Sequence, residues 1–166
     1  NPQKEGFDVV VANPPWGDRV RDEILSHYPV RTNDTSGLFI QHALMNLRPG
    51  GRAVVVVPEG LLFRGGAEQR LRVMLTKDHC LEAVLGLPEG LFQPYTLIRS
   101  CILVVRRGGE TKQVRMVDAS AYFEPAKGRR APSIQPTAIE DLVAEVRGTE
   151  ETANGWNVAV ESLAAI

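Results

Sequence analysis

Apolar residues follow two different spacings along the chain. Runs in which nearly every residue is apolar predict strands buried on both faces of a parallel sheet, at 7–12, 52–58 and 81–87. Between them, apolar residues recur every three or four positions and predict helices at 36–47 and 67–77. Ser36 is the expected cap of the first helix, and Pro49-Gly50-Gly51 is expected to end it. The order strand, helix, strand, helix, strand predicts an α/β fold with right-handed crossovers.

The pattern changes in the second half of the chain. Strands predicted at 100–107 and 113–118 are close in sequence, and Gly108-Gly109 between them predicts an antiparallel hairpin at the edge of the sheet. Three prolines then mark a linker, which leads to an amphipathic helix at 137–147 and a weak strand in the tail. We therefore divide the chain into an α/β unit, residues 1–120, and a linker, helix and tail, residues 121–166.

The composition is that of an ordinary globular chain, with 43% hydrophobic residues, 23% charged residues and a net charge of −1. This near-neutral charge argues against a domain that holds nucleic acid mainly by bulk charge. The run Lys127-Gly128-Arg129-Arg130 is the best candidate for a phosphate-touching loop, although a solvated loop is the slightly favoured interpretation. Neither a membrane-spanning run nor a secretory leader is present, so we expect a cytoplasmic protein. Because the chain begins with Asn1, we also expect it to be a piece of a longer protein.

Cysteine and histidine do not form a metal-binding pattern. Cys80 and Cys101 each lie in an apolar run without a CxxC partner, which is typical of small buried residues in a reduced protein. The histidines, His27, His42 and His79, lack ligand spacing. We therefore expect no metal site.

The candidate chemistry lies in Asn13-Pro14-Pro15-Trp16, directly after the first predicted strand. In open α/β sheets, ligands bind at the carboxyl ends of parallel strands. An amine on an aromatic base is a poor nucleophile because its lone pair is delocalised into the ring. The amide oxygen of Asn13 and the carbonyl of Pro14 could accept its two hydrogens and direct the lone pair towards a methyl donor.

The neighbouring residues suit the same task. The two prolines restrict the backbone, so both acceptors would be held in place before the reaction. Trp16 offers a flat face on which a base could stack. The alternative is a strand-ending turn whose Trp packs into the core. The position after a buried strand, with a polar loop at 17–35 beyond it, favours the functional interpretation.

A family resemblance extends these observations. ANPPWG resembles the (N/D/S)-P-P-(Y/F/W) motif of methyltransferases that modify amino groups with S-adenosylmethionine. The downstream segments SGLFIQHAL, LRPGGRAVVVVPEGLLFRGG, RLRVML and LPEGLF resemble the modification subunits of type I restriction systems. The similarity covers most of residues 7–120. It implies a DNA adenine-N6 methyltransferase and the second half of a Rossmann-like fold, so that 1–120 is the C-terminal half of the catalytic domain.

The resemblance also implies roles for individual residues. Asn13 and Pro14 would hold the target amine next to the cofactor S-adenosylmethionine, and Pro15 would shape the turn. Trp16 would stack on one face of an adenine flipped out of the duplex, and Phe92 would cover the other. A core position for Phe92 is equally compatible with the sequence. The residues after it, 93–98, depart from the Gly and Thr usual in the family, which leaves the geometry of this loop open.

The family's Gly-x-Gly turn for the cofactor and its acidic ribose contact have no counterpart here. We therefore expect the isolated chain to bind S-adenosylmethionine weakly or not at all, and the parent protein to be the active enzyme. The implied partners are DNA and a sequence-specificity subunit or domain, and a restriction subunit is a further candidate. Two alternatives stay open, namely methylation of another planar amine, in protein glutamine or RNA, and a non-catalytic assembly module.

Overall fold

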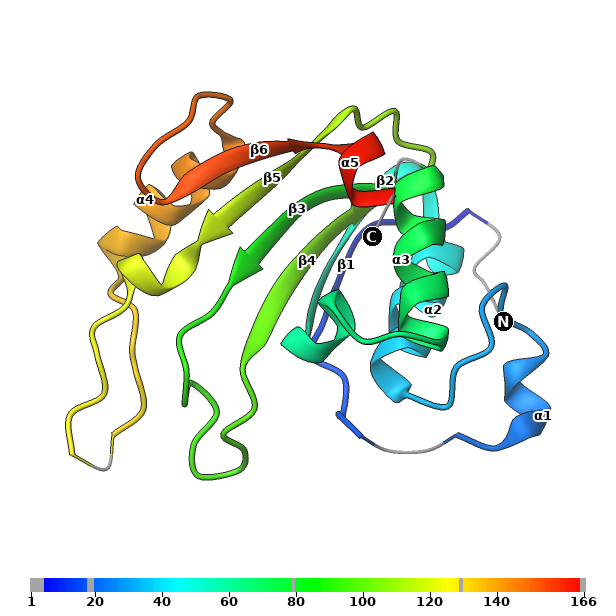
Figure 1. The fold of residues 1–166 in the computed structure, drawn as a ribbon, viewed down its shortest axis with the longest axis horizontal. Coiled ribbons are helices and arrows are strands. Elements are labelled where there is room, and N and C mark those ends of the chain that lie inside the picture. Colours follow the sequence, from blue (N-terminus) through cyan, green and yellow to red (C-terminus); the bar gives the residue numbers. More distant parts are fainter. Residues whose placement is uncertain (1–4, 18–19, 79, 129, 165–166) are drawn as a thin grey trace.

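The computed structural model describes residues 5–17, 20–78, 80–128 and 130–164. A six-stranded sheet runs through the molecule in the order β1-β2-β4-β3-β5-β6 (Figure 1). Its strands span Phe7–Ala12 (β1), Leu47–Pro58 (β2), Leu81–Gly86 (β3), Ser100–Arg106 (β4), Gln113–Asp118 (β5) and Gly155–Ala159 (β6). The helices are Asp22–Leu25 (α1), Thr35–Asn46 (α2), Ala67–Lys77 (α3), Pro136–Arg147 (α4) and Val160–Ala164 (α5). Each predicted strand and long helix is present, which confirms the α/β class.

The predicted hairpin at Gly108-Gly109 is wrong. β4 lies between β2 and β3 and is antiparallel to both, whereas β5 pairs in parallel with β3 and in antiparallel with β6. The antiparallel strand is therefore central, and the edge is formed by β6. β4 is hydrogen-bonded along both of its edges, and Cys101, Leu103 and Val105, which share one of its faces, are almost fully inaccessible to solvent.

β1 was expected to be buried on both faces, and this expectation is also wrong. Val9 is 59% exposed and Val11 is 77% exposed. Among the described residues β1 pairs with β2 alone, in parallel, and forms one edge of the sheet. Its inward residue Val10 packs against the core, but no described helix covers the opposite face. β1 thus has apolar side chains that the described residues do not cover.

The junction between α2 and β2 differs from prediction by a few residues. Asp34, not Ser36, caps α2, since its Oδ1 accepts a hydrogen bond from the Ser36 N–H at 2.9 Å. The helix ends at Asn46, and Pro49-Gly50-Gly51 lies inside β2, where it forms a bulge against β1. Gly50 adopts a φ of 80°, a conformation that favours glycine.

The two faces of the sheet are covered unequally. α2, α3 and α5 gather over one face (Figure 1). Leucine and isoleucine side chains fill that interface, and burial of each stabilises the fold by roughly 1.5–3 kcal/mol; they include Ile40, Leu47, Leu71, Leu75 and Leu103. On the other face, Leu142 and Val146 of α4 pack against β3 and β5, next to Ala83, Leu85 and Val117.

β6 and α5 belong to this same sheet and core. β6 is hydrogen-bonded to β5 along its length, and Leu163 of α5 packs against the main core. The division of the chain at residue 120 stays a prediction.

Candidate active site

The Asn13-Pro14-Pro15-Trp16 turn leaves the carboxyl end of β1 and is fixed to the start of α2. The hydroxyl of Thr35, the first residue of α2, donates a hydrogen bond to the Pro15 carbonyl at 2.6 Å. Thr35 and Pro14 are buried, whereas Asn13 and Pro15 are exposed. The turn is therefore held by its prolines and by one buried side chain from a neighbouring element.

The two proposed acceptors are available at this turn. Within the described part of the chain, no hydrogen bond engages the Asn13 side chain or the Pro14 carbonyl, and the contact from Thr35 uses the next carbonyl along. An exposed amide oxygen and an adjacent free carbonyl can each accept one hydrogen of an amine. The local geometry thus permits the chemistry that the sequence suggested.

Trp16 and Phe92 contact each other directly. Their ring centroids are 5.1 Å apart and their planes meet at 84°, an edge-to-face arrangement. A base stacked between two parallel rings needs them about 7 Å apart, twice the van der Waals separation. The present geometry has no such slot between this pair, although each ring also lines the neighbouring cleft. The stacking roles of both residues stay predictions.

The indole N–H of Trp16 is buried and has no hydrogen-bond partner among the described residues. A buried donor without a partner is uncommon and carries a desolvation cost of about 1–3 kcal/mol. The Trp16 N–H is therefore an unsatisfied buried donor at the candidate site.

The tetrapeptide and the loop after β3 together line one open cleft of about 670 Å³. The turn contributes Asn13, Pro14, Pro15 and Trp16, and the loop contributes Phe92, Tyr95, Thr96 and Ile98. The structure thus brings together all five residues singled out in the sequence. It adds three from the 93–98 segment, which sequence reasoning had noted only as a departure from the family; their closeness to Phe92 was the available signal.

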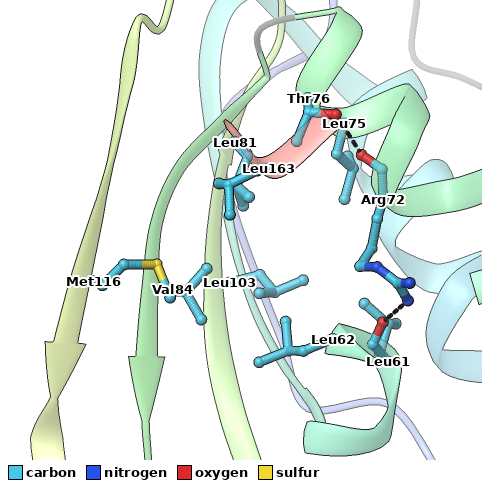
Figure 2. A pocket seen from close by; sticks show the side chains of 10 residues that line it. All are labelled: Leu61, Leu62, Arg72, Leu75, Thr76, Leu81, Val84, Leu103, Met116 and Leu163. Atoms are coloured by element: carbon cyan, nitrogen blue, oxygen red, sulfur yellow. Dashed lines mark hydrogen bonds between the residues drawn. The ribbon is translucent and has the colours of Figure 1, made fainter. Parts of the chain in front are cut away.

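A separate cavity of about 140 Å³ lies between α3 and the sheet (Figure 2). Its walls are mainly leucines, including Leu163 of α5, and Met116 of β5 lies on the side away from α3. Arg72 is the charged lining residue, and its Nη1 already donates to the Leu61 carbonyl at 2.8 Å and the Arg64 carbonyl at 2.7 Å. This cavity is an apolar packing gap and offers no free acceptor for an amine.

The remaining reactive residues do not form a second site in the described part of the chain. Cys80 and Cys101 are buried free thiols, and burial raises the pKa of Cys101 to about 12, so it is not a nucleophile at neutral pH. Nδ1 of His42 lies 3.1 Å from the Tyr28 hydroxyl, and His79 falls outside the described residues. Among the residues described, no three His, Cys, Asp or Glu side chains are grouped as a metal site would require.

Lys127 and Arg130, the first and last residues of the basic run, are hydrogen-bonded to each other. The Arg130 N–H donates to the Lys127 carbonyl at 3.1 Å, and the Lys127 ammonium lies 3.8 Å from the Glu124 carboxylate. Arg129 falls outside the described residues. A phosphate-touching role for this run stays a prediction. In the described part of the chain no helix is long and apolar enough to cross a membrane.

The chain is similar in sequence to modification subunits of type I restriction enzymes. It is 31% identical to the EcoEI methylase subunit of Escherichia coli over 97% of this chain and 35% of that protein. It is 32% identical to the MpnII methylase subunit of Mycoplasma pneumoniae over 91% of this chain and 30% of that protein. The chain thus spans about a third of the length of these relatives.

Two solved structures share the fold of this chain. A type I restriction-modification methyltransferase subunit from Streptococcus thermophilus has the same fold, with a TM-score of 0.86, 23% identity, and coverage of 98% of this chain and 36% of that one. A modification subunit of a putative type I restriction enzyme from Vibrio vulnificus superposes with a TM-score of 0.78 at 26% identity, covering 96% of this chain and 35% of that one. The sequence profile of the N-6 DNA methylases matches residues 1–165. The chain therefore belongs to the N-6 DNA methylase family.

Proposed function

We propose that this chain is the amine-binding half of an S-adenosylmethionine-dependent DNA adenine-N6 methyltransferase, and that the parent protein is the active enzyme. The observation that carries the proposal is the pair of free acceptors, the Asn13 amide oxygen and the Pro14 carbonyl, on a turn fixed by Thr35 at the edge of an open cleft. Relatives named as methylase subunits of type I restriction enzymes support DNA as the substrate.

The residues of the chain would perform the acceptor side of the reaction. The two N–H bonds of the adenine N6 amine would donate to Asn13 and Pro14, which draws the nitrogen lone pair out of conjugation and aims it away from the ring. Because the turn is rigid, little ordering is needed when the base arrives. S-adenosylmethionine supplies an electrophilic methyl group. Trp16 would stack on the base and help to hold it outside the duplex.

The chain fits only one end of the cofactor. Asn13 and Pro14 could adjoin the transferred methyl group, but the sequence contains no Gly-x-Gly turn to hold the nucleoside and amino-acid portions. The bare edge and outer face of β1 support the same division, since Val9 and Val11 are apolar residues without a covering element. We therefore propose that the rest of the parent covers this face and binds most of the cofactor.

Partners are proposed on the same basis. One solved relative, 31% identical to this chain with a TM-score of 0.76, comes from a study of complex assembly in a type I restriction-modification system. The parent would likewise work with a sequence-specificity subunit or domain, and a restriction subunit could join that complex. The net charge of −1 is consistent with a division in which other domains read the DNA sequence.

Transfer of tritiated methyl groups by the full-length parent tests the proposal. Label in adenine of unmethylated DNA is expected, and Asn13→Ala should abolish it. Asn33→Ala is the matched control, because Asn33 is exposed and its side chain has no hydrogen bond to the described residues. Label in protein or RNA would instead favour a different planar amine, and no label would favour an assembly module. Calorimetry that finds sub-micromolar S-adenosylmethionine binding to the isolated chain would contradict the proposed division of the cofactor site.

A further inference from the structure

Tyr95 is the most exposed large aromatic side chain of the described residues, at 93%, and it lines the same cleft as Asn13 and Trp16. Its hydroxyl has no hydrogen-bond partner in the described part of the chain. A side chain so placed contributes almost nothing to the fold. Lone exposed aromatics are common on protein surfaces, so exposure alone would not single it out. Tyr95 is singled out because it lines the same cleft as the proposed amine acceptors Asn13 and Pro14.

The backbone under Tyr95 is well anchored. The N–H groups of Tyr95 and Thr96 both donate to the Phe92 carbonyl, at 2.9 and 3.2 Å, and the Gln93 N–H donates to the Gly90 carbonyl at 3.1 Å. The Leu87 N–H closes the base of the loop by donating to the Ser100 carbonyl at 3.0 Å. The loop thus presents a free aromatic ring on a fixed backbone, an arrangement that gives a binding residue its position without a large ordering cost.

Phe92, the other aromatic residue of this loop, is already engaged. Its ring meets Trp16 edge to face, and it also packs against the hydrophobic cluster that contains Leu85 and Leu87. With the Trp16 and Phe92 centroids 5.1 Å apart, a base cannot stack between them without displacing one ring. Phe92 is thus well placed to orient Trp16, and the base still lacks a cover on its second face.

We propose that Tyr95 is this cover, the second aromatic wall of the site that receives the flipped purine. The purine would rest with one face on Trp16, its amine at Asn13 and Pro14, and its other face against the Tyr95 ring. This inference rests on the proposed function, because it assigns a further base-contacting residue to the same cleft. Stacking by a purine would bury the exposed ring on binding, so Tyr95 would contribute to affinity for the extruded base rather than to folding.

Steady-state methyl transfer by the full-length parent tests the assignment. Tyr95→Ala is expected to lower kcat/KM for DNA roughly 10- to 100-fold, mainly through KM, as loss of one base-stacking ring does. Tyr95→Phe keeps the ring and should stay within about threefold of the wild type, whereas Tyr95→Leu, apolar but without a π face, should not rescue. Leu97→Ala is the matched control, since Leu97 is 67% exposed on the same loop but does not line the cleft.

A spectroscopic measurement separates stacking from a structural effect. The parent's recognition sequence is first mapped from N6-methyladenine in host DNA, and 2-aminopurine then replaces the target adenine in a duplex. Ring stacking quenches this base, so the complex with Tyr95→Ala should fluoresce more brightly than the wild-type complex, and Tyr95→Phe should restore most of the quenching.

The outcomes distinguish this inference from the function on which it rests. Wild-type activity with inactive Asn13→Ala and a Tyr95→Ala variant within twofold of wild type would overturn only the role of Tyr95. Rescue by Tyr95→Leu as complete as by Tyr95→Phe would overturn it as well. A wild-type parent that labels no adenine would overturn both.

Discussion

Replacing Glu145 with Ala should destabilise the chain by about 3 kcal/mol. Glu145 pairs with Arg115, and the two side chains are only 12% and 6% exposed. The carboxylate also accepts hydrogen bonds from the Thr152 hydroxyl at 2.8 Å and the Tyr122 hydroxyl at 2.9 Å. This polar cluster joins β5, α4 and the loop that leads to β6. Loss of the carboxylate would leave a buried guanidinium without its counter-charge.

The size of the expected loss depends on the hydrogen bonds that Arg115 retains in the variant. Removing one member of a buried ion pair costs about 3–5 kcal/mol. In the variant, Nε of Arg115 would still donate to the Glu145 backbone carbonyl, now 3.1 Å away, and Nη1 to the Glu150 carbonyl, now 2.8 Å away. Two of its contacts therefore survive, which places the expected loss at the lower end of that range.

Urea unfolding of the chain, followed by circular dichroism, measures the loss. Glu140→Ala is the matched control, because Glu140 is an exposed acid on the same helix and should change stability by at most about 0.5 kcal/mol. A further variant, Arg115→Met with Glu145→Leu, removes both charges and should be more stable than Glu145→Ala alone. The reasoning is refuted if Glu145→Ala loses no more stability than Glu140→Ala, or if the double variant is the less stable of the two.

Three further predictions concern the side chains of Glu145, Thr35 and Cys101. The Thr152 hydrogen bond, together with Tyr122 and Arg115, lowers the pKa of Glu145 in the folded chain. The ionised carboxylate therefore contributes stability above about pH 4.3, its unfolded pKa, and this contribution is lost as the pH falls through the lower folded pKa. Between pH 7 and pH 3 the urea midpoint should decline less for Glu145→Gln than for the wild type. Thr35→Val removes the hydrogen bond to the Pro15 carbonyl and should lower stability by about 1 kcal/mol. It should also lower methyl transfer by the parent, and unchanged transfer would contradict a role for Thr35 in positioning the turn. Because burial raises the pKa of Cys101 to about 12, iodoacetamide should leave it unmodified in the native chain at pH 8 and alkylate it in urea, as mass spectrometry would show.

The sequence pattern was most informative where local chemistry decides the structure. Each strand and long helix lies close to its predicted position, because apolar spacing reports burial within one element. The Asn13-Pro14-Pro15-Trp16 turn follows β1 as expected, since two prolines cannot continue a strand ladder. The cap of α2 was misplaced because Asp34 and Ser36 are both good capping residues and spacing alone could not choose between them.

Pairing between elements was less predictable. β4 and β5 are neighbours in sequence, but β4 pairs with β2 and β3 instead of with β5, and the apolar spacing within a strand does not report which strands lie beside it. The sequence of β1 predicts burial because its residues are apolar, but an apolar sequence does not show whether another element covers them, and Val9 and Val11 are exposed. Tyr95 could not be assigned to the cleft, because its position depends on a loop folding back beside the carboxyl end of another strand.

The central position of β4 also determines when the sheet can form during translation. β2 and β3 are never paired with each other, so the exposed ladder edges of both must wait for Ser100–Arg106 to leave the ribosome. Until then β2 can pair with β1 along one edge but β3 has no partner, so a ribosome stalled before residue 100 would hold an aggregation-prone intermediate. Ribosome-bound chains that end before and after β4 should therefore differ sharply in protease resistance.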